Sequence, residues 1–447
     1  MKASLAKGTR DFLPLQAKRR KYIFKIIEDC FIHFGYQPLE TPAIENLSTL
    51  TGKYGEEGDK LLFKILNSGD YLKSANEEFL KEKNSSKLIP SISEKGLRYD
   101  LTVPFARVVS MNIGKLSLPF KRYQIQPVWR ADRPQRGRYR EFYQCDADVV
   151  GSKSLMYEAE LALIYDRVFQ SLGIPVQIII NHRAILEGMA IQTGSQDQFV
   201  EMTVALDKLD KIGESGVREE LLKLNMVVEK ADWILNQLQI KELSQFRFND
   251  IASKGVMEIE EVFRYVETSH PYNEILFEPR LARGLSYYTG CIFEVIPKNI
   301  QMGSLGGGGR YDNLTGAFGL PDVPGVGVSF GADRIYDVME ELNLFPEQLG
   351  VAIQVLFIAL DNESHLACFK LANQLRVKGI TVDIYPEPDK LKKQFKYAED
   401  LKVPFVVIIG EKERQNELCN IKNQENGEQQ TIAWGSLKSF FAATKLE

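Results

Sequence analysis

The segment of the chain richest in chemically active side chains is 115–142. It carries eight lysine and arginine residues against two acidic ones, although the whole chain has a net charge of −4. The basic residues are Lys115, Lys121, Arg122, Arg130, Arg133, Arg136, Arg138 and Arg140. Alternate side chains of a strand share one face, and a guanidinium group binds phosphate through two parallel hydrogen bonds. The segment therefore predicts a polyphosphate or RNA-backbone site, with a solvated basic hairpin as the alternative.

Three later segments combine glycines with arginines and tyrosines. Residues 283–290 join an arginine to two adjacent tyrosines, whose side chains would point to opposite faces of a strand; an aromatic core strand is the alternative. Residues 303–312 include four consecutive glycines, which favour either close backbone approach to a ligand or a flexible loop. Residues 325–334 predict a strand running into a helix. Its glycines would leave room for a flat base and Arg334 would reach a phosphate, unless they only allow tight strand–helix packing.

Asp100 and Thr102 are two residues apart in the string RYDLT. On a strand they would share a face and together accept hydrogen bonds from an ammonium group. An aspartate on a surface strand is otherwise uninformative.

Several common motifs are missing from the sequence. No Gly-Lys is followed by Ser or Thr at Walker spacing, and the glycines at 325, 327 and 331 miss the dinucleotide fingerprint by one residue. No two of the four histidines have the spacing of an H-x-x-x-H metal site. No dedicated metal site is therefore predicted.

Composition indicates a large globular protein. The chain has 447 residues, 44% of them apolar, and 60 acidic against 56 basic side chains, which argues against a simple nucleic-acid coat. We find no signal peptide and no apolar run long enough to cross a bilayer. Five widely spaced cysteines without a C-x-x-C pair indicate reduced thiols. We therefore expect a cytoplasmic protein of about three domains.

Hydrophobic periodicity divides the chain into parts. Helices are expected over 15–34 and 155–172, strand-bearing segments over 97–107, 122–129 and 141–150, and a polar excursion with a short helix over 64–96. Residues 188–271 read as a helical insertion, and 275–331 return to strand and glycine signals. After residue 350 strands alternate with helices, which predicts a separate α/β domain with largely parallel strands. A helix near its middle carries Lys390, Lys392, Lys393 and Lys396, which form either an RNA-facing patch or a solvated face.

Together and in this order, the segments resemble class II aminoacyl-tRNA synthetases, specifically the histidyl-tRNA synthetase family. The opening KGTRDF looks like that family's N-terminal signature, and GYQPLETP resembles class II motif 1. WRAD with RGRYREF looks like motif 2, and Gly327 to Arg334 looks like motif 3. Residues 283–290 and 306–312 resemble the two peptides that mark the histidine enzyme. LRYDLTVPFAR and REFYQCD are similar to its eukaryotic-like branch.

The resemblance implies an α+β catalytic domain whose antiparallel sheet is flanked by helices. Residues 1–187 and 272–345 would form it, 188–271 would be a helical insertion, and 350–447 would be a C-terminal α/β anticodon-binding domain. The implied reaction joins L-histidine to tRNA(His) through a histidyl-adenylate, with ATP and Mg²⁺. A homodimer without membrane association is implied as well.

The resemblance also implies roles for individual residues. Arg130 and Arg283 would be catalytic at the α-phosphate, and both would also contact histidine. ATP would be bound by Arg130, Asp132, Arg138, Phe142 and Arg334. Histidine would further be bound by Asp100, Thr102, Gln144, Asp148, Tyr287 and Tyr288. Asp132 stands where the family usually has glutamate, Ser286 replaces a common aspartate, and relatives can carry glutamate at the position of Asp148.

A second hypothesis is a synthetase-like paralogue that senses histidine or regulates another enzyme without charging tRNA. Such paralogues typically lose the anticodon domain or the motif 2 and motif 3 arginines. This chain retains Arg130, Arg283, Arg334 and a C-terminal domain, so the resemblance favours the ligase.

Overall fold

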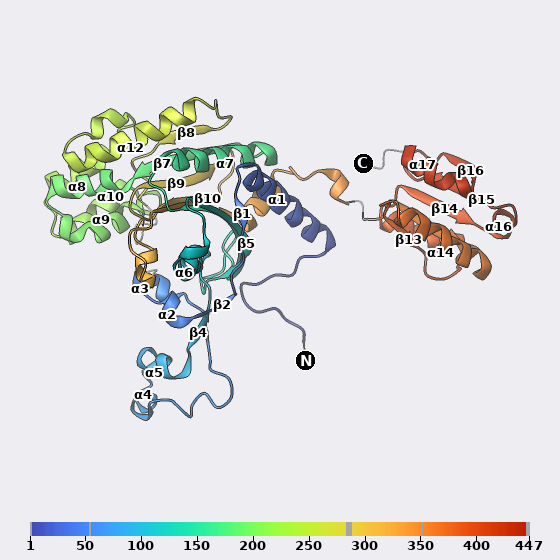
Figure 1. Cartoon of the computed structure of the whole chain (residues 1–447), viewed down its shortest axis with the longest axis horizontal. Helices are drawn as coiled ribbons and strands as arrows, with labels where there is room; N and C mark the ends of the chain where they lie inside the picture. Colours follow the sequence, from blue (N-terminus) through green and yellow to red (C-terminus); the bar gives the residue numbers. More distant parts are fainter. Residues whose placement is uncertain (1, 53–54, 283–287, 351, 444–447) are drawn as a thin grey trace. The chain divides into compact units, whose positions relative to one another are not determined.

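The computed structural model describes residues 2–52, 55–282, 288–350 and 352–443. The chain forms two compact units: Met1–Leu13 with Arg19–Leu344, and Pro14–Lys18 with Phe345–Glu447. Each unit is built around its own sheet (Figure 1). Within the described residues, no helix is long and apolar enough to cross a membrane.

An eight-stranded, mostly antiparallel sheet is the centre of the first unit. Only its two edge pairs, β1 with β5 and β7 with β8, are parallel. In spatial order the strands are β1 (Gln37–Pro38), β5 (Phe120–Trp129), β6 (Glu141–Val150), β11 (Gly325–Gly331), β10 (Gly306–Arg310), β9 (Cys291–Pro297), β7 (Val176–His182) and β8 (Glu274–Phe277).

Strand alternation separates the two faces of this sheet. Phe330 of β11 packs against Phe31 of α1 (Pro14–His33) and against Tyr165 and Phe169 of α7 (Met156–Leu172). Its neighbour Ser329 points to the other face, which is polar. The two expected helices, 15–34 and 155–172, are therefore confirmed, and they cover the apolar face. A shorter helix, α13 (Ala332–Glu341), continues directly from β11.

The polar excursion lies outside the large sheet. Two short helices, α4 (Glu77–Lys81) and α5 (Ser85–Ile92), occupy it, where one was expected. It is attached through a small sheet of β2 (Ile44–Asn46), β4 (Lys95–Leu97) and β3 (Lys64–Ile65). The nearby α2 (Leu47–Leu50) and α3 (Gly55–Lys60) complete this part of the first unit.

The stretch after β7 is helical, as expected. It contains α8 (Arg183–Thr193), α9 (Phe199–Leu206), α10 (Leu209–Lys223, kinked at Gly213), α11 (Val228–Gln237) and α12 (Asp250–Glu267). Helix α12 packs against α7, α8 and β7, so the helical stretch contacts the sheet edge (Figure 1).

The expected strand over 97–107 is wrong beyond Leu97. Residues 98–101 belong to no strand or helix, and helix α6 (Thr102–Asn112) follows them, with Val103, Pro104, Phe105, Ala106 and Val109 buried. The Asp100 carboxylate accepts a hydrogen bond from the Val103 amide at 3.1 Å, which caps the helix start. The β-branched residues of this segment favour a strand, but the helix cap and the tertiary contacts determine that it forms a helix.

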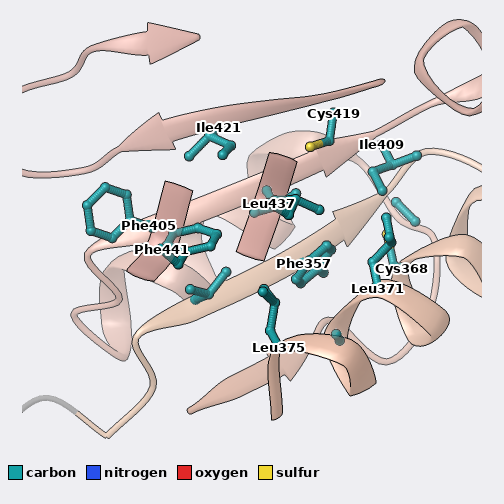
Figure 2. Close-up of a cluster of buried hydrophobic side chains, with 14 residues drawn as sticks. Phe357, Cys368, Leu371, Leu375, Phe405, Ile409, Cys419, Ile421, Leu437 and Phe441 are labelled. Atoms are coloured by element: carbon teal, nitrogen blue, oxygen red, sulfur yellow. The ribbon is translucent and has the colours of Figure 1, made fainter. Parts of the chain in front are cut away.

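The second unit is the expected α/β domain. Strands β13 (Val382–Ile384), β12 (Val355–Ala359) and β14 (Phe405–Ile409) are parallel, and β15 (Leu418–Asn423) and β16 (Gln429–Ala433) extend the sheet antiparallel. Its helices are α14 (Asn362–Arg376), α15 (Leu391–Asp400), α16 (Glu411–Gln415) and α17 (Leu437–Ala443). Figure 2 shows Phe357, Leu371, Leu375, Phe405 and Phe441 gathered in one apolar core of this unit.

Candidate active site

A cavity of about 420 Å³ lies on the polar face of the large sheet. It is lined by side chains from β6, β10 and β11, from the β5–β6 hairpin and from the start of α6. Ten of the predicted site residues line it: Asp100, Thr102, Arg130, Asp132, Arg138, Phe142, Gln144, Asp148, Tyr288 and Arg334. The remaining two, Arg283 and Tyr287, lie outside the described residues, as does Ser286.

Arg130 follows the last residue of β5 and is held at the edge of the cavity. Its Nε donates to the Tyr99 carbonyl oxygen at 3.0 Å. Its guanidinium carbon lies 4.2 Å from the centre of the Tyr99 ring and 5.2 Å from that of Phe142. One hydrogen bond and two aromatic rings thus orient a planar, charged fork toward the cavity, which suits recognition of a phosphate or carboxylate.

The basic residues of the hairpin do not share one face. Adjacent residues of a strand point in opposite directions. Lys121 accordingly bonds to the Phe34 carbonyl and pairs with Glu160 at 2.6 Å, whereas Arg122 is fully buried and lies 2.8 Å from the Asp148 carboxylate. The basic side chains therefore divide between the two faces of the hairpin, and the phosphate site predicted from them stays a prediction. Only Arg130 and Arg138 of this segment bring positive charge to the cavity lining.

Strand β6 contributes a row of polar side chains to the cavity floor. Gln144, Asp146 and Asp148 alternate with the buried Cys145, Ala147 and Val149. Asp148 Oδ1 accepts a 2.5 Å hydrogen bond from the Tyr311 hydroxyl. Among the described residues, Gln144 Oε1 and Asp146 Oδ1 are buried without a hydrogen-bond partner. Unpaired buried acceptors of this kind are costly, so they indicate a place for a donor from a ligand.

Burial controls the ionisation of the two aspartates. It raises the pKa of Asp146 to about 7, against the opposing charge of Arg122 and assisted by the neighbouring Asp148 carboxylate. Burial also raises the pKa of Asp148, while Arg122 and the Tyr311 hydroxyl oppose the shift. Two carboxylates and one buried arginine thus leave the floor able to bind a cation.

The glycine run forms strand β10 in the centre of the sheet. Here the flexible-loop alternative is wrong, because the run pairs in register with β9 and β11. A Cβ on Gly309 would approach the Tyr288 ring to 2.9 Å, and one on Gly327 would overlap the Asp148 carboxylate. These glycines therefore make room for cavity side chains; at Gly327 the space holds a carboxylate and not the expected flat base.

The other end of the cavity is rich in arginine. Arg334 Nε donates to the Gly137 carbonyl at 2.8 Å, and its Nη1 donates to the Ser304 carbonyl at 2.6 Å. Arg138 lies 3.9 Å from the Asp132 carboxylate and is half exposed. The hairpin turn and the start of α13 therefore meet around two guanidinium groups, opposite the acidic floor.

Comparisons with known proteins decide the family. A profile described as histidyl-tRNA synthetase matches residues 70–335, and one described as an anticodon binding domain matches 354–444. The chain belongs to the histidyl-tRNA synthetase family. A histidine–tRNA ligase of Cytophaga hutchinsonii is 51% identical over 439 residues, covering 96% of this chain and 97% of that protein.

Solved structures agree with this family's fold. The histidyl-tRNA synthetase from Nostoc sp. PCC 7120 aligns with a TM-score of 0.81 at 28% identity, covering 99% of both chains. A Bacillus halodurans protein titled ATP phosphoribosyltransferase regulatory subunit/histidyl-tRNA synthetase aligns with a TM-score of 0.71 at 19% identity, over 90% of this chain and 97% of that one. The latter likeness shows the fold alone. The expected class II architecture is confirmed.

The family's N-terminal signature contacts the arginine-rich end of the site. The Arg10 guanidinium lies 2.7 Å from the Asp333 carboxylate and 3.9 Å from the centre of the Tyr139 ring. Asp333 also accepts the Tyr143 amide at 2.9 Å. The signature thus links the motif 2 hairpin to the motif 3 helix, a role that the sequence did not suggest.

Four further residues of the site were not predicted from the sequence: Asp146, Tyr311, Arg122 and Ser329. Asp146 could have been found, because it lies two residues from both Gln144 and Asp148 on one strand. Tyr311 carries a weaker signal, its position two residues after the last glycine of the run. Arg122 was counted only as part of the basic segment 115–142, and Ser329 has no distinguishing pattern.

No group of three or more His, Cys, Asp or Glu side chains with the geometry of a metal site occurs in the described parts of the chain.

Proposed function

We propose that this chain activates L-histidine with ATP and transfers it to tRNA(His). The observation that carries this function is the division of one cavity into an arginine-rich end and an acidic floor. The first suits a polyphosphate and the second an amino acid with a cationic group and ring N–H donors. Histidine would attack the α-phosphate to give histidyl-adenylate and pyrophosphate, and the terminal ribose hydroxyl of tRNA would then displace AMP.

The arginine-rich end is assigned to ATP. Arg130 would bind the α-phosphate and the histidine carboxylate, where charge grows in the transition state. Arg138 and Arg334 would hold the β- and γ-phosphates, and Phe142 would stack on adenine beside Asp132. The carbonyl contacts of Arg334 would then be exchanged for stronger charge-assisted bonds to phosphate. Arg283 is assigned the opposite side of the α-phosphate.

The acidic floor is assigned to histidine. Asp100, Thr102 and Gln144 would receive the ammonium group, and Asp148 and Tyr288 would bind the imidazole nitrogens, with Tyr287 nearby. Tyr311 and Arg122 hold the Asp148 carboxylate from both sides. A held carboxylate and a phenol discriminate strongly, because an analogue without ring N–H leaves them buried and unpaired.

Three further assignments complete the proposal. Magnesium would enter with ATP, bound mainly by phosphate oxygens, and would neutralise phosphate charge. The C-terminal α/β unit would read the anticodon stem-loop. The enzyme would act in the cytoplasm as a homodimer formed through motif 1.

Histidine-dependent ATP–pyrophosphate exchange tests the proposed function. We expect exchange with histidine and none with other amino acids; absence of exchange with histidine would instead favour the regulatory paralogue. Arg283→Ala should lower the single-turnover rate of adenylate formation far more than histidine affinity. In contrast, Tyr288→Phe should weaken the binding of histidine and leave the KM for ATP nearly unchanged.

A further inference from the structure

The inference concerns Asp146, a cavity residue to which the family resemblance assigns no role. It is 1% exposed and lies in the middle of β6, opposite Gln124 of β5 and Ser329 of β11. Its Oδ1 has no hydrogen-bond partner among the described residues. Asp166 of α7 differs from it, because both of its carboxylate oxygens accept, from the Tyr272 and Asn273 amides.

The neighbouring groups indicate which part of a ligand Asp146 receives. Gln144, the next residue on the same face, donates through Nε2 to Ser329 Oγ at 3.0 Å and leaves its Oε1 without a partner. Asp100, at the start of α6, is close enough for its charge to act on Asp146. On the other side, Asp148 is already bound by Tyr311 and Arg122. Gln144 Oε1 and Asp146 Oδ1 are therefore unpaired acceptors two residues apart on one face of β6, beside the Asp148 carboxylate that Arg122 neutralises.

An ammonium group carries three donors, no acceptor and a full positive charge. It matches two unpaired acceptors beside a second carboxylate better than an imidazole does, since imidazole has one donor on each of at most two nitrogens. We propose that Asp146 is a histidine-binding residue whose Oδ1 accepts a hydrogen bond from the α-ammonium group, alongside Gln144 Oε1. This inference rests on the proposed function and adds a specificity contact to it.

The test compares Asp146→Asn with Asp148→Asn. Asparagine keeps the shape of aspartate and removes its charge. Asp146→Asn should raise the histidine KM about ten- to hundredfold, the range of a charge-assisted hydrogen bond, and leave the ATP KM within about twofold. The thermal midpoint should stay the same or rise, because the variant removes a buried negative charge. Asp166→Asn is the control: it should lower the thermal midpoint and leave the histidine KM unchanged.

Two inhibitors separate the ammonium from the ring. L-Histidinol retains both groups, and 3-(imidazol-4-yl)propionate lacks the ammonium. Asp146→Asn should weaken inhibition by histidinol and leave inhibition by the propionate unchanged, whereas Asp148→Asn should weaken both. The proposal would be overturned if Asp146→Asn weakened inhibition by the two compounds equally, or if it weakened inhibition by neither. Failure of the wild-type chain to exchange with histidine would reject the proposed function itself, which keeps the two outcomes distinct.

Discussion

Asp146 and Glu158 are both buried carboxylates of the first unit, yet their surroundings differ. Glu158, in the first turn of α7, is 0% exposed and receives Arg310 of β10 on both oxygens, at 2.5 and 2.8 Å. Asp146 is 1% exposed and keeps one oxygen without a partner in the described structure. Burial alone therefore does not identify a binding residue in this protein. A carboxylate that is buried in the wall of a cavity and lacks a hydrogen-bond partner is the better indicator of a binding residue.

The charges explain this difference. Burial raises the pKa of Glu158, and the hydrogen bond and charge of Arg310 oppose the shift. Burial alone would lower the pKa of Arg310, but the hydrogen bond and the charge of Glu158 raise it by more, so the pKa of Arg310 is raised. The arginine nearest Asp146, Arg122, is bound to Asp148 and to the Leu101 carbonyl instead. The Glu158–Arg310 pair joins helix α7 to the sheet. The Arg122–Asp148 pair, in contrast, leaves the Asp146 carboxylate available to a ligand.

The largest effect is expected when the satisfied pair is broken. Glu158→Gln removes the carboxylate that receives the buried Arg310 guanidinium on both oxygens and leaves it only the more distant Asp312, at 3.4 Å. The free energy of unfolding should therefore fall by about 3 kcal/mol. Urea unfolding in a Trp434→Phe background would report the first unit through Trp129 and Trp233. The double variant Glu158→Gln/Arg310→Met should recover part of the loss. A loss below about 1 kcal/mol would show that the two carboxylates are not different in kind.

The next effect should appear in affinity as well as in stability. Tyr311→Phe removes the hydroxyl that donates to Asp148 Oδ1, and the freed carboxylate oxygen remains buried. The histidine KM should rise by a factor that corresponds to about 2 kcal/mol, with the ATP KM unchanged. Pyrophosphate exchange at varied histidine and varied ATP measures both. Equal increases in the two constants would indicate that the hydroxyl supports the whole cavity and not the histidine side of it.

The sequence revealed part of this contrast. Helical periodicity and strand alternation predicted α1, α7, β5 and β6, and the motif residues Arg130, Gln144 and Asp148 all line the cavity. The pairing of Glu158 with Arg310 was not predictable, because the two residues are 152 positions apart and meet only when the sheet forms. The same holds for Arg10 and Asp333. Asp100 and Thr102 were wrongly placed on a strand, because β-branched residues follow them. The hydrogen bond that caps the start of α6 outweighs that local preference.

A smaller effect should follow the pH dependence of Asp146. Its pKa is about 7 in the folded chain and 3.8 without the fold, so the folded state holds more protons between these values. The associated stability is present below about pH 4 and is lost as pH rises through 7. Asp146→Asn does not titrate at this position. Its advantage in unfolding free energy over the wild type should therefore grow from pH 5 to pH 8.

Thermal unfolding of both chains in matched buffers at pH 5, 6.5 and 8 would measure this difference. Asp166→Asn serves again as the comparison, because it replaces a buried carboxylate that accepts two amide hydrogen bonds. The loss of unfolding free energy in Asp166→Asn relative to the wild type should not become smaller as the pH rises. A constant gap between wild type and Asp146→Asn across this range would mean that Asp146 is charged throughout.

The smallest effect on stability is expected in the second unit, where the ion pairs are exposed. Lys393 of α15 lies 2.5 Å from the Asp389 carboxylate, but 69% of its side chain is accessible to solvent. Water and salt screen such a pair, so Lys393→Ala should leave the urea midpoint of this unit unchanged. Pyrophosphate exchange, which needs no tRNA, should also be unchanged. If Lys393 contacts a phosphate of the anticodon stem-loop, aminoacylation by Lys393→Ala should show a higher KM for tRNA. That KM should depend less steeply on salt than the wild-type value, because one phosphate contact is lost. An unchanged tRNA KM would leave the lysines of α15 as a solvated face, and the C-terminal unit would then bind RNA through a different surface.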